Sequence, residues 1–255
     1  MARRQIESRL PPPYLRRIWL DAAQIDDPQA YPFSLPFLAD GFELTFEQAV
    51  TVIVGENGVG KSTLIEGIAA LAGYDDAGGG KGYRPVDHSR AIERSGSLLG
   101  GALRAAWLPK VTSGWFFKAE TFFSVARYLD VAAQEPLSGP PPDYLSQSHG
   151  EGFLRFFDER LRRQGLYFFD EPESALSPSR QVAFLKILRR MQRSSNAQVV
   201  IATHSPMIMA LPDVALLRMT RHGLEPVTLE ETDHFRLWRE FCLSPATFVD
   251  GMIED

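Results

Sequence analysis

The residues best suited to chemistry in this sequence form a glycine-rich loop that ends in a lysine and a serine. Residues 55–62 read GENGVGKS, and loops of the pattern G-x-x-x-x-G-K-S hold phosphate groups with their backbone N–H groups. Lys61 is expected to reach the β- and γ-phosphates of a nucleotide, and the Ser62 hydroxyl to bind Mg²⁺. The predicted phosphate-binding residues are Gly55, Asn57, Gly58, Gly60, Lys61, Ser62 and Thr63.

A strand and a helix are expected on either side of this loop. Residues 50–54 are apolar and β-branched, which favours a strand, and residues 63–72 are helical in character. The N-terminus of a helix presents unpaired N–H groups and a positive dipole end to an anion. This setting favours a phosphate loop over the alternative, a glycine-rich turn that carries a lysine by chance.

Two adjacent carboxylates follow another apolar stretch. Residues 166–169 read LYFF and lead directly into Asp170 and Glu171, and Pro172 then stops the strand. At the tip of a buried strand, Asp170 is expected to complete the Mg²⁺ site and Glu171 to accept a proton from the attacking water. Surface charge is the alternative, but the upstream phosphate loop favours catalysis.

A histidine follows the β-branched strand expected at residues 198–203. His204 would leave a parallel sheet at the same edge as Glu171, within reach of the γ-phosphate and the attacking water. The predicted catalytic residues are therefore Lys61, Glu171 and His204. Three other histidines show no partner pattern and receive no role: His88, His222 and His234.

Composition narrows the class of protein. With 44% hydrophobic and 23% charged residues among 255, the chain is globular. The net charge of -5 shows no basic excess for nucleic acid or an anionic membrane, although arginines gather at 155–163 and 180–193. The single cysteine, Cys242, excludes an intramolecular disulfide framework and favours the cytoplasm.

Membrane insertion by this chain is not expected. No stretch approaches the ~18 consecutive apolar residues that a membrane helix needs. Residues 1–14 are charged and proline-rich, unlike a secretory signal.

Further elements follow from local patterns. The strands expected at residues 14–20 and 42–46 would form an antiparallel pair, and Tyr31 or Phe37 between them could stack on a base or simply pack. The glycine-rich segment 73–83 is expected to be a mobile surface loop near the nucleotide. The remaining expected strands are 103–108, 114–119, 214–219 and 224–229, and the remaining helices are 122–133, 153–163, 178–194, 231–241 and 245–253. Residues 136–146 read as a stiff linker.

Taken in order, five segments resemble the motifs of the ABC-type ATPases, and in particular their small, soluble SMC- and RecF-like bacterial members. These segments are the phosphate loop and residues 148–151, 168–173, 174–177 and 203–205. The resemblance spans about residues 14–217. It implies an α/β P-loop NTPase with a mostly parallel core sheet, antiparallel N-terminal strands and a smaller helical signature lobe.

The resemblance also implies domain limits and a partner. The single domain would have a core lobe at about 14–73 and 165–230, a signature lobe at about 74–164, and C-terminal helices at 231–255. Ser148 and Gly150 match the signature that acts on the nucleotide of a second subunit, and residues 174–177 match the loop that crosses to it. The chain would then form a homodimer that encloses ATP.

The sequence departs from the family pattern at several positions. His149 stands where the family usually has glycine, which puts activation across the dimer in doubt, and Ser177 replaces the usual aspartate of transporter ATPases. The family glutamine between the lobes has only a weak counterpart in Glu120. The long coiled coil of SMC relatives is replaced by residues of about 74–145.

Three functions remain open on this evidence. The first is Mg²⁺-dependent ATP hydrolysis that drives a conformational cycle on a macromolecular partner, DNA or protein, in repair or defence. The second is the nucleotide-binding subunit of a membrane transporter, although Glu151, Glu173 and Ser177 resemble the soluble branch more closely. The third is a nucleotide-dependent switch with little turnover.

Overall fold

The computed structural model describes residues 10–81, 95–111, 113–119, 149–161 and 163–253. Within them a seven-stranded main sheet has the order β10-β9-β3-β8-β7-β6-β4. Its strands are β3 (Val50–Val54), β4 (Gly79–Gly80), β6 (Gly114–Lys118), β7 (Gly165–Asp170), β8 (Ala197–Ala202), β9 (Ala215–Thr220) and β10 (Gly223–Pro226). The five central strands run parallel, and β10 and β4 are antiparallel at the two edges.

A second sheet is small and wholly antiparallel. It has the order β2-β1-β5 and consists of β1 (Leu15–Leu20), β2 (Glu43–Thr45) and β5 (Leu103–Trp107). The antiparallel pair expected near the N-terminus is confirmed. Together the two sheets confirm the predicted α/β fold with a mostly parallel core and antiparallel N-terminal strands.

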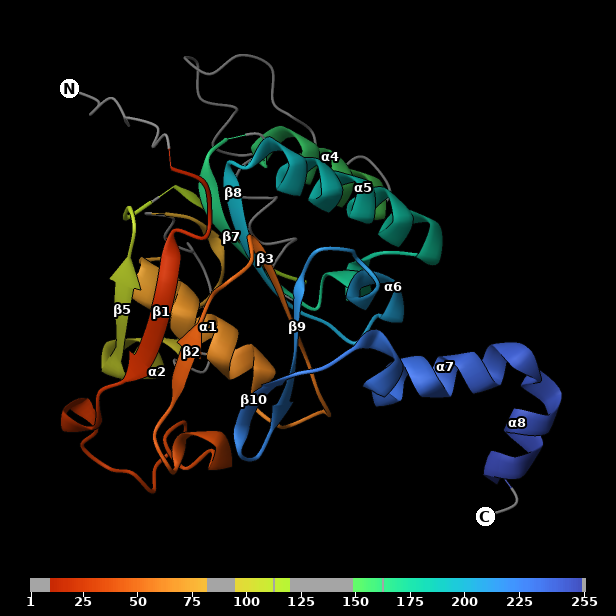
Figure 1. The fold of residues 1–255 in the computed structure, drawn as a ribbon, viewed down its shortest axis with the longest axis horizontal. Coiled ribbons are helices and arrows are strands. Elements are labelled where there is room, and N and C mark those ends of the chain that lie inside the picture. Colours follow the sequence, from red (N-terminus) through yellow and green to blue (C-terminus); the bar gives the residue numbers. More distant parts are fainter. Residues whose placement is uncertain (1–9, 82–94, 112, 120–148, 162, 254–255) are drawn as a thin grey trace.

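Helices cover both faces of the main sheet (Figure 1). On one face lie α1 (Lys61–Ala72) and α2 (Ser95–Ala102), and on the other α4 (His149–Arg160) and α5 (Pro178–Ser194). The helices α6 (Pro206–Met209), α7 (Asp233–Leu243) and α8 (Pro245–Ile253) follow, and α7 and α8 extend away from the sheets. Four short 3₁₀ turns complete the described elements: η1 (Ala22–Gln24), η2 (Pro36–Leu38), η3 (Pro172–Ala175) and η4 (Leu229–Glu231).

The central strands are apolar along their whole length because both faces are covered. Phe168 packs with α1 and the small sheet, whereas its neighbour Phe169 packs with α4 and α5. On that second face Phe157 of α4 and Phe184 of α5 bring their ring centroids within 5.4 Å. Continuous rather than alternating hydrophobicity is what a parallel sheet between two helical layers requires.

The segment 73–83 differs from the mobile surface loop that its glycines predicted. Tyr74 is only 5% exposed, donates its hydroxyl to the Leu166 carbonyl at 3.1 Å and meets Phe168 edge-on. Residues 79–80 form β4 and pair with β6. Burial of one aromatic side chain outweighs the conformational freedom of the glycines, and residues 82–83 lie outside the described part.

The segment 74–164, where a smaller helical lobe was expected, lies in part outside the described residues. Its described part supplies β5 to the small sheet and β4 and β6 to the main sheet. Those strands belong to the core because their buried side chains, such as Phe116 and Phe117, pack on both faces of the sheet. The expected helix 122–133 and linker 136–146 lie outside the described residues.

Glycines explain how α2 packs closely on α1. A Cβ at Gly67 would lie 2.8 Å from the Leu99 side chain, and one at Gly100 would lie 2.9 Å from the Gly67 carbonyl oxygen. The two helices approach where side chains would otherwise separate them. In the described parts of the chain no helix combines the length and apolarity needed to cross a membrane.

Candidate nucleotide-binding site

The glycine-rich loop connects β3 to the N-terminus of α1, as its sequence predicts. Gly55, Gly58 and Gly60 have φ values of 150°, 78° and 101°, which side chains of L-residues rarely adopt. A Cβ at Gly60 would lie 2.9 Å from the ring of Phe37, and one at Gly55 would lie 2.7 Å from the Met219 carbonyl oxygen. The loop therefore requires glycine for both its conformation and its packing.

Lys61 lies within this loop. Its Nζ donates to the carbonyl oxygens of Gly55 at 2.8 Å and Glu56 at 2.7 Å. Burial lowers the pKa of the ammonium, while the carboxylates of Glu171 and Asp170 act in the opposite direction. A partly desolvated cation beside backbone N–H groups is suited to a phosphate ligand.

Asp170 ends β7 and lies opposite the loop. It is 7% exposed, and its Oδ1 accepts a hydrogen bond from the Ser62 hydroxyl at 3.1 Å. Burial raises the pKa of this carboxyl to about 7, although the Lys118 ammonium and the Ser62 hydrogen bond favour its charged form. A buried carboxylate beside a hydroxyl fits a divalent cation, which would favour the charged form further.

A cation at this point would need ligands from outside the protein. Among the described residues, no group of three or more histidine, cysteine, aspartate or glutamate side chains could hold a metal ion. Ser62 and Asp170 supply two oxygens, so phosphate and water would complete the coordination. This is the usual arrangement for Mg²⁺ bound with a nucleotide.

A buried ion pair beside Asp170 was not anticipated from the sequence. Lys118, the last residue of β6, brings its Nζ to 2.5 Å from the Glu66 carboxylate of α1, and both side chains are about one-tenth exposed. The register pairs Lys118 with Asp170 across β6 and β7. The sequence does contain a signal for this pair: Lys118 ends an apolar strand, and a buried charge there needs a partner of opposite charge.

Glu171 lies at the tip of the same strand. Its backbone is left-handed, with φ 47° and ψ 53°, and its side chain is 41% exposed. Its Oε1 lies 3.5 Å from the Nε2 of His204, which follows the neighbouring strand β8. A non-glycine residue in this conformation is typical of sites where backbone strain positions a functional side chain.

Two side chains fix His204 from different directions. The Glu173 carboxylate accepts a hydrogen bond from the His204 backbone N–H at 2.5 Å, and the Nδ1 atom of the imidazole lies 2.8 Å from the Nε2 of His234. His234, which showed no partner pattern in the sequence, thus has a partner in the structure. Burial, and next the charge of Lys61, lower the pKa of His204, while Glu171 raises it.

The structure brings the predicted Lys61, Ser62, Asp170, Glu171 and His204 to one edge of the main sheet. Two other predicted site residues make no described contact with this group of side chains. Asn57 is exposed in the loop, and Gly150 lies in the first turn of α4. Ser148 and Glu120 lie outside the described residues.

The two aromatic candidates for base contact lie in different settings. Phe37 is 2% exposed and packs beneath Gly60, as ordinary packing predicts. Tyr31 is 49% exposed, and its hydroxyl lies 2.5 Å from that of Thr63, the last predicted phosphate-binding residue. Tyr31 therefore keeps a face available beside the loop.

Two models of known protein families match parts of this chain. A family model described as "AAA domain" matches residues 34–102, and another, described as "AAA domain, putative AbiEii toxin, Type IV TA system", matches residues 137–210. The first contains the phosphate loop, and the second contains Asp170, Glu171 and His204. This chain is a P-loop NTPase.

Two solved structures illustrate what this P-loop NTPase is similar to. CbiO1 from Clostridium perfringens, part of the ABC transporter complex cbiONQ, is 17% identical, with 95% of this chain and 99% of that chain covered and a TM-score of 0.48. The SMC head domain from Thermotoga maritima is 14% identical, with 84% and 99% covered and a TM-score of 0.46. A search among curated proteins found no significant match.

Proposed function

We propose that this P-loop NTPase hydrolyses ATP with Mg²⁺ and does so as a homodimer that encloses the nucleotide. The observation that carries the proposal is the meeting of Glu171 and His204, 3.5 Å apart, at the sheet edge where Lys61 and Ser62 begin α1. Phosphate-binding groups and a proton acceptor thus come together in one place. We further propose that the chain is one ATPase domain.

The side chains divide the work of hydrolysis. Lys61 holds the β- and γ-phosphates, and Ser62 and Asp170 hold Mg²⁺, which neutralises phosphate charge when it is bound. Glu171 accepts a proton from the attacking water through its partly exposed carboxylate. His204 donates a hydrogen bond from Nε2 to a γ-phosphate oxygen and thereby orients the reacting group.

A second copy of the chain completes the site. Ser174 and Ser177 are exposed directly after the catalytic Glu171, which leaves this loop available to cross to a partner. In the proposed dimer, Ser148 and Gly150 of one chain act on the nucleotide of the other. ATP binding closes the interface, and hydrolysis opens it.

The test is the Glu171→Gln variant, which keeps the shape of the side chain but removes the proton acceptor. With saturating Mg-ATP it should bind nucleotide, lose at least about 100-fold in turnover and scatter light as a dimer. Lys61→Ala is the matched control and should lose nucleotide affinity in calorimetry. A Glu171→Gln protein that stays monomeric with ATP bound would contradict the homodimer and point to a site completed by another chain.

The partner is proposed to be a macromolecule engaged in repair or defence. The toxin–antitoxin description of the family model that matches residues 137–210 supports defence. Helix α5 carries arginines at 180–193, of which Arg189 and Arg190 pair with Asp213 and Asp158. Adding double-stranded DNA to the trapped dimer separates the possibilities. A further rise in mass would support DNA as the partner, and no rise would favour a protein.

A further inference from the structure

His234 stands in the first turn of α7 and meets His204 ring to ring. The two imidazole centroids are 4.9 Å apart, and the Nδ1 of His204 lies 2.8 Å from the Nε2 of His234. The start of α7 is well held, because Thr232 is 1% exposed and its hydroxyl donates to the Leu229 carbonyl and accepts from the Phe235 N–H. His234 is therefore presented from a fixed point.

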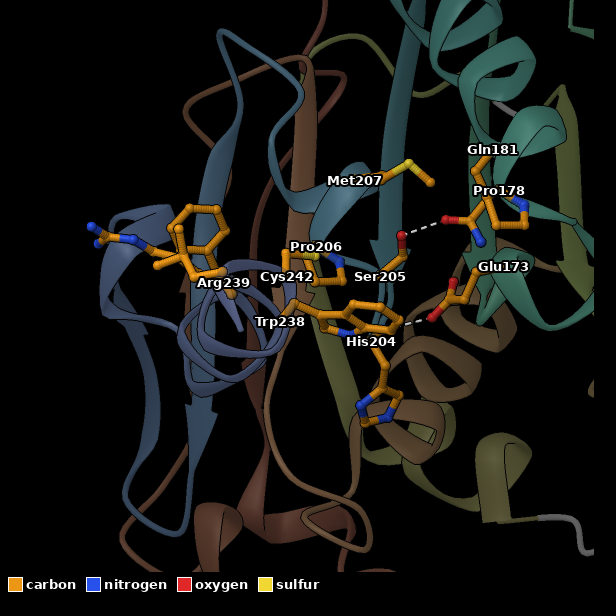
Figure 2. Close-up of a pocket in the computed structure, with 12 residues that line it drawn as sticks. Glu173, Pro178, Gln181, His204, Ser205, Pro206, Met207, Trp238, Arg239 and Cys242 are labelled. Carbon is orange, nitrogen blue, oxygen red and sulfur yellow. Dashed lines mark hydrogen bonds between the residues drawn. The ribbon is translucent and has the colours of Figure 1, made fainter. Parts of the chain in front are cut away.

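Different contacts fix the main chain and the ring of His204. Glu173 accepts the backbone N–H of His204, and Figure 2 shows this contact at the wall of an adjoining apolar cavity of about 670 Å³. The α7 side chains Trp238 and Cys242 line the same cavity. The Glu173 carboxylate thus fixes the backbone position of His204, and His234 determines which nitrogen of the His204 imidazole carries the proton.

The hydrogen bond between the rings selects a tautomer. One nitrogen must donate and the other accept. If His204 donated from Nδ1, its Nε2 would carry a bare lone pair facing the Glu171 carboxylate at 3.5 Å, and two acceptors would oppose each other. If His234 donates instead, the His204 proton resides on Nε2 and points toward Glu171.

The surrounding charges favour a neutral His204. Lys61 and His234 oppose its protonation, while Glu171 and Glu56 favour it, and burial has the largest effect and disfavours the charge. The charged groups near His234 are Asp233 and Arg218, which line a second cavity together with it. A neutral imidazole can still donate to phosphate, provided that its one proton is on Nε2.

We propose that His234 is a positioning residue, whose N–H donor holds neutral His204 in the tautomer that presents Nε2–H to a γ-phosphate oxygen. The proposal rests on the role of His204 given above. It makes the first turn of α7 part of the catalytic edge, so the docked position of that helix contributes to turnover. The role resembles that of the buried partner that orients a catalytic imidazole elsewhere.

Three variants test the proposal through turnover. His234→Leu should lower kcat by about 10- to 100-fold, the range seen when a partner orienting a functional histidine is lost, and leave KM for ATP within about twofold, because Lys61 and the loop still bind nucleotide. His234→Gln keeps an N–H donor at the same reach and should restore most of kcat. His222→Gln, at an exposed histidine in the β9–β10 turn, is the control and should match the unmodified protein.

A second measurement reads the tautomer itself and needs no turnover. ¹⁵N NMR of histidine-labelled protein should show His204 protonated at Nε2 in the unmodified chain and in His234→Gln. In His234→Leu, where only Glu171 still favours the proton on Nε2, the Nδ1-protonated tautomer should be more populated. An Nδ1-protonated His204 in the unmodified protein would overturn the proposal, as would an unchanged kcat in a folded His234→Leu variant. If the chain does not hydrolyse ATP, the proposed function fails, but the NMR measurement still shows whether His234 sets the tautomer of His204.

Discussion

At the scale of single residues, burial rather than residue type gives the carboxylates their different properties. Asp170 and Glu171 are adjacent, yet Asp170 is 7% exposed beside Ser62 whereas the Glu171 side chain is 41% exposed. A buried carboxylate can hold a cation with little water between them, and an exposed one can exchange a proton with water. The two proposed roles follow from this difference in environment.

The raised pKa of Asp170 leads to a prediction about stability and pH. The folded pKa of Asp170 is about 7, against an ordinary value of 3.8, so between these two values the folded chain binds more protons and its stability falls as pH rises. Asp170→Asn removes the buried charge. Without nucleotide, the stability of this variant relative to the unmodified protein should therefore increase between pH 4 and pH 8, by about a few kcal/mol in the free energy of unfolding. The difference between their melting temperatures should increase in the same direction.

Thermal melts at pH 5 and pH 8 check this prediction. Asp26→Asn, which changes an exposed carboxylate, serves as the control and should show no such trend. A difference between Asp170→Asn and the unmodified protein that stays constant with pH would contradict the burial argument. In activity assays Asp170→Asn should also be less active and need more Mg²⁺ for half of its maximal rate, since one proposed ligand is gone.

At the scale of elements, one buried glutamine joins the two sheets. Gln198 of β8 is 0% exposed. Its side-chain oxygen accepts from the N–H groups of Tyr14 and Leu15, each at 2.8 Å, and its Nε2 donates to the Leu15 carbonyl at 2.9 Å. The N-terminal strand β1 is thereby attached to the centre of the main sheet, near the amino ends of its parallel strands.

Replacing this glutamine with leucine should destabilise the fold. Gln198→Leu has nearly the same volume but leaves two N–H groups and one carbonyl without partners, so we expect a loss of about 3 kcal/mol in the free energy of unfolding. Urea unfolding measures it. Gln24→Leu, at an exposed position in η1, should change little, and an equally small effect of Gln198→Leu would show that water or a rearranged backbone satisfies these groups.

At the scale of the whole molecule, the proposed dimer places each active site between two chains. A chain carrying Lys61→Ala cannot hold phosphate at its own loop but keeps an intact residue 150. A chain carrying Gly150→Asp has the opposite defect. A symmetric two-chain site can therefore be rebuilt from two inactive variants.

Mixing the two variants before ATP is added should restore activity. Half of the randomly formed dimers contain one of each chain, and each of these has one intact site, so the mixture should reach about a quarter of the unmodified rate. Each variant alone should stay inactive. A mixture no more active than its components would mean that Gly150 does not act across an interface.

The sequence determined the local parts of this protein because their causes are local. The strand at Val50–Val54 and the helix at Pro245–Ile253 have the predicted bounds, since β-branched runs and a proline at a helix start act within a few residues. The phosphate loop was equally readable, because its glycines are required by the backbone itself. The order of the motifs then indicated a parallel sheet whose strand ends meet at one edge.

Only the tertiary structure decided contacts between distant segments. Helix α2, which begins Ser95-Gly-Ser, has poor intrinsic helix propensity, and it forms where its glycines permit close contact with α1. The segment at Tyr74 is buried because the ring of Tyr74 packs against Phe168. His234 shows the same limit most clearly: it lies 30 positions after His204, and it reaches that ring because η4, which follows the β9–β10 hairpin, leads the chain into α7. Such proximity depends on the path of the folded backbone, which no short pattern of residue types records.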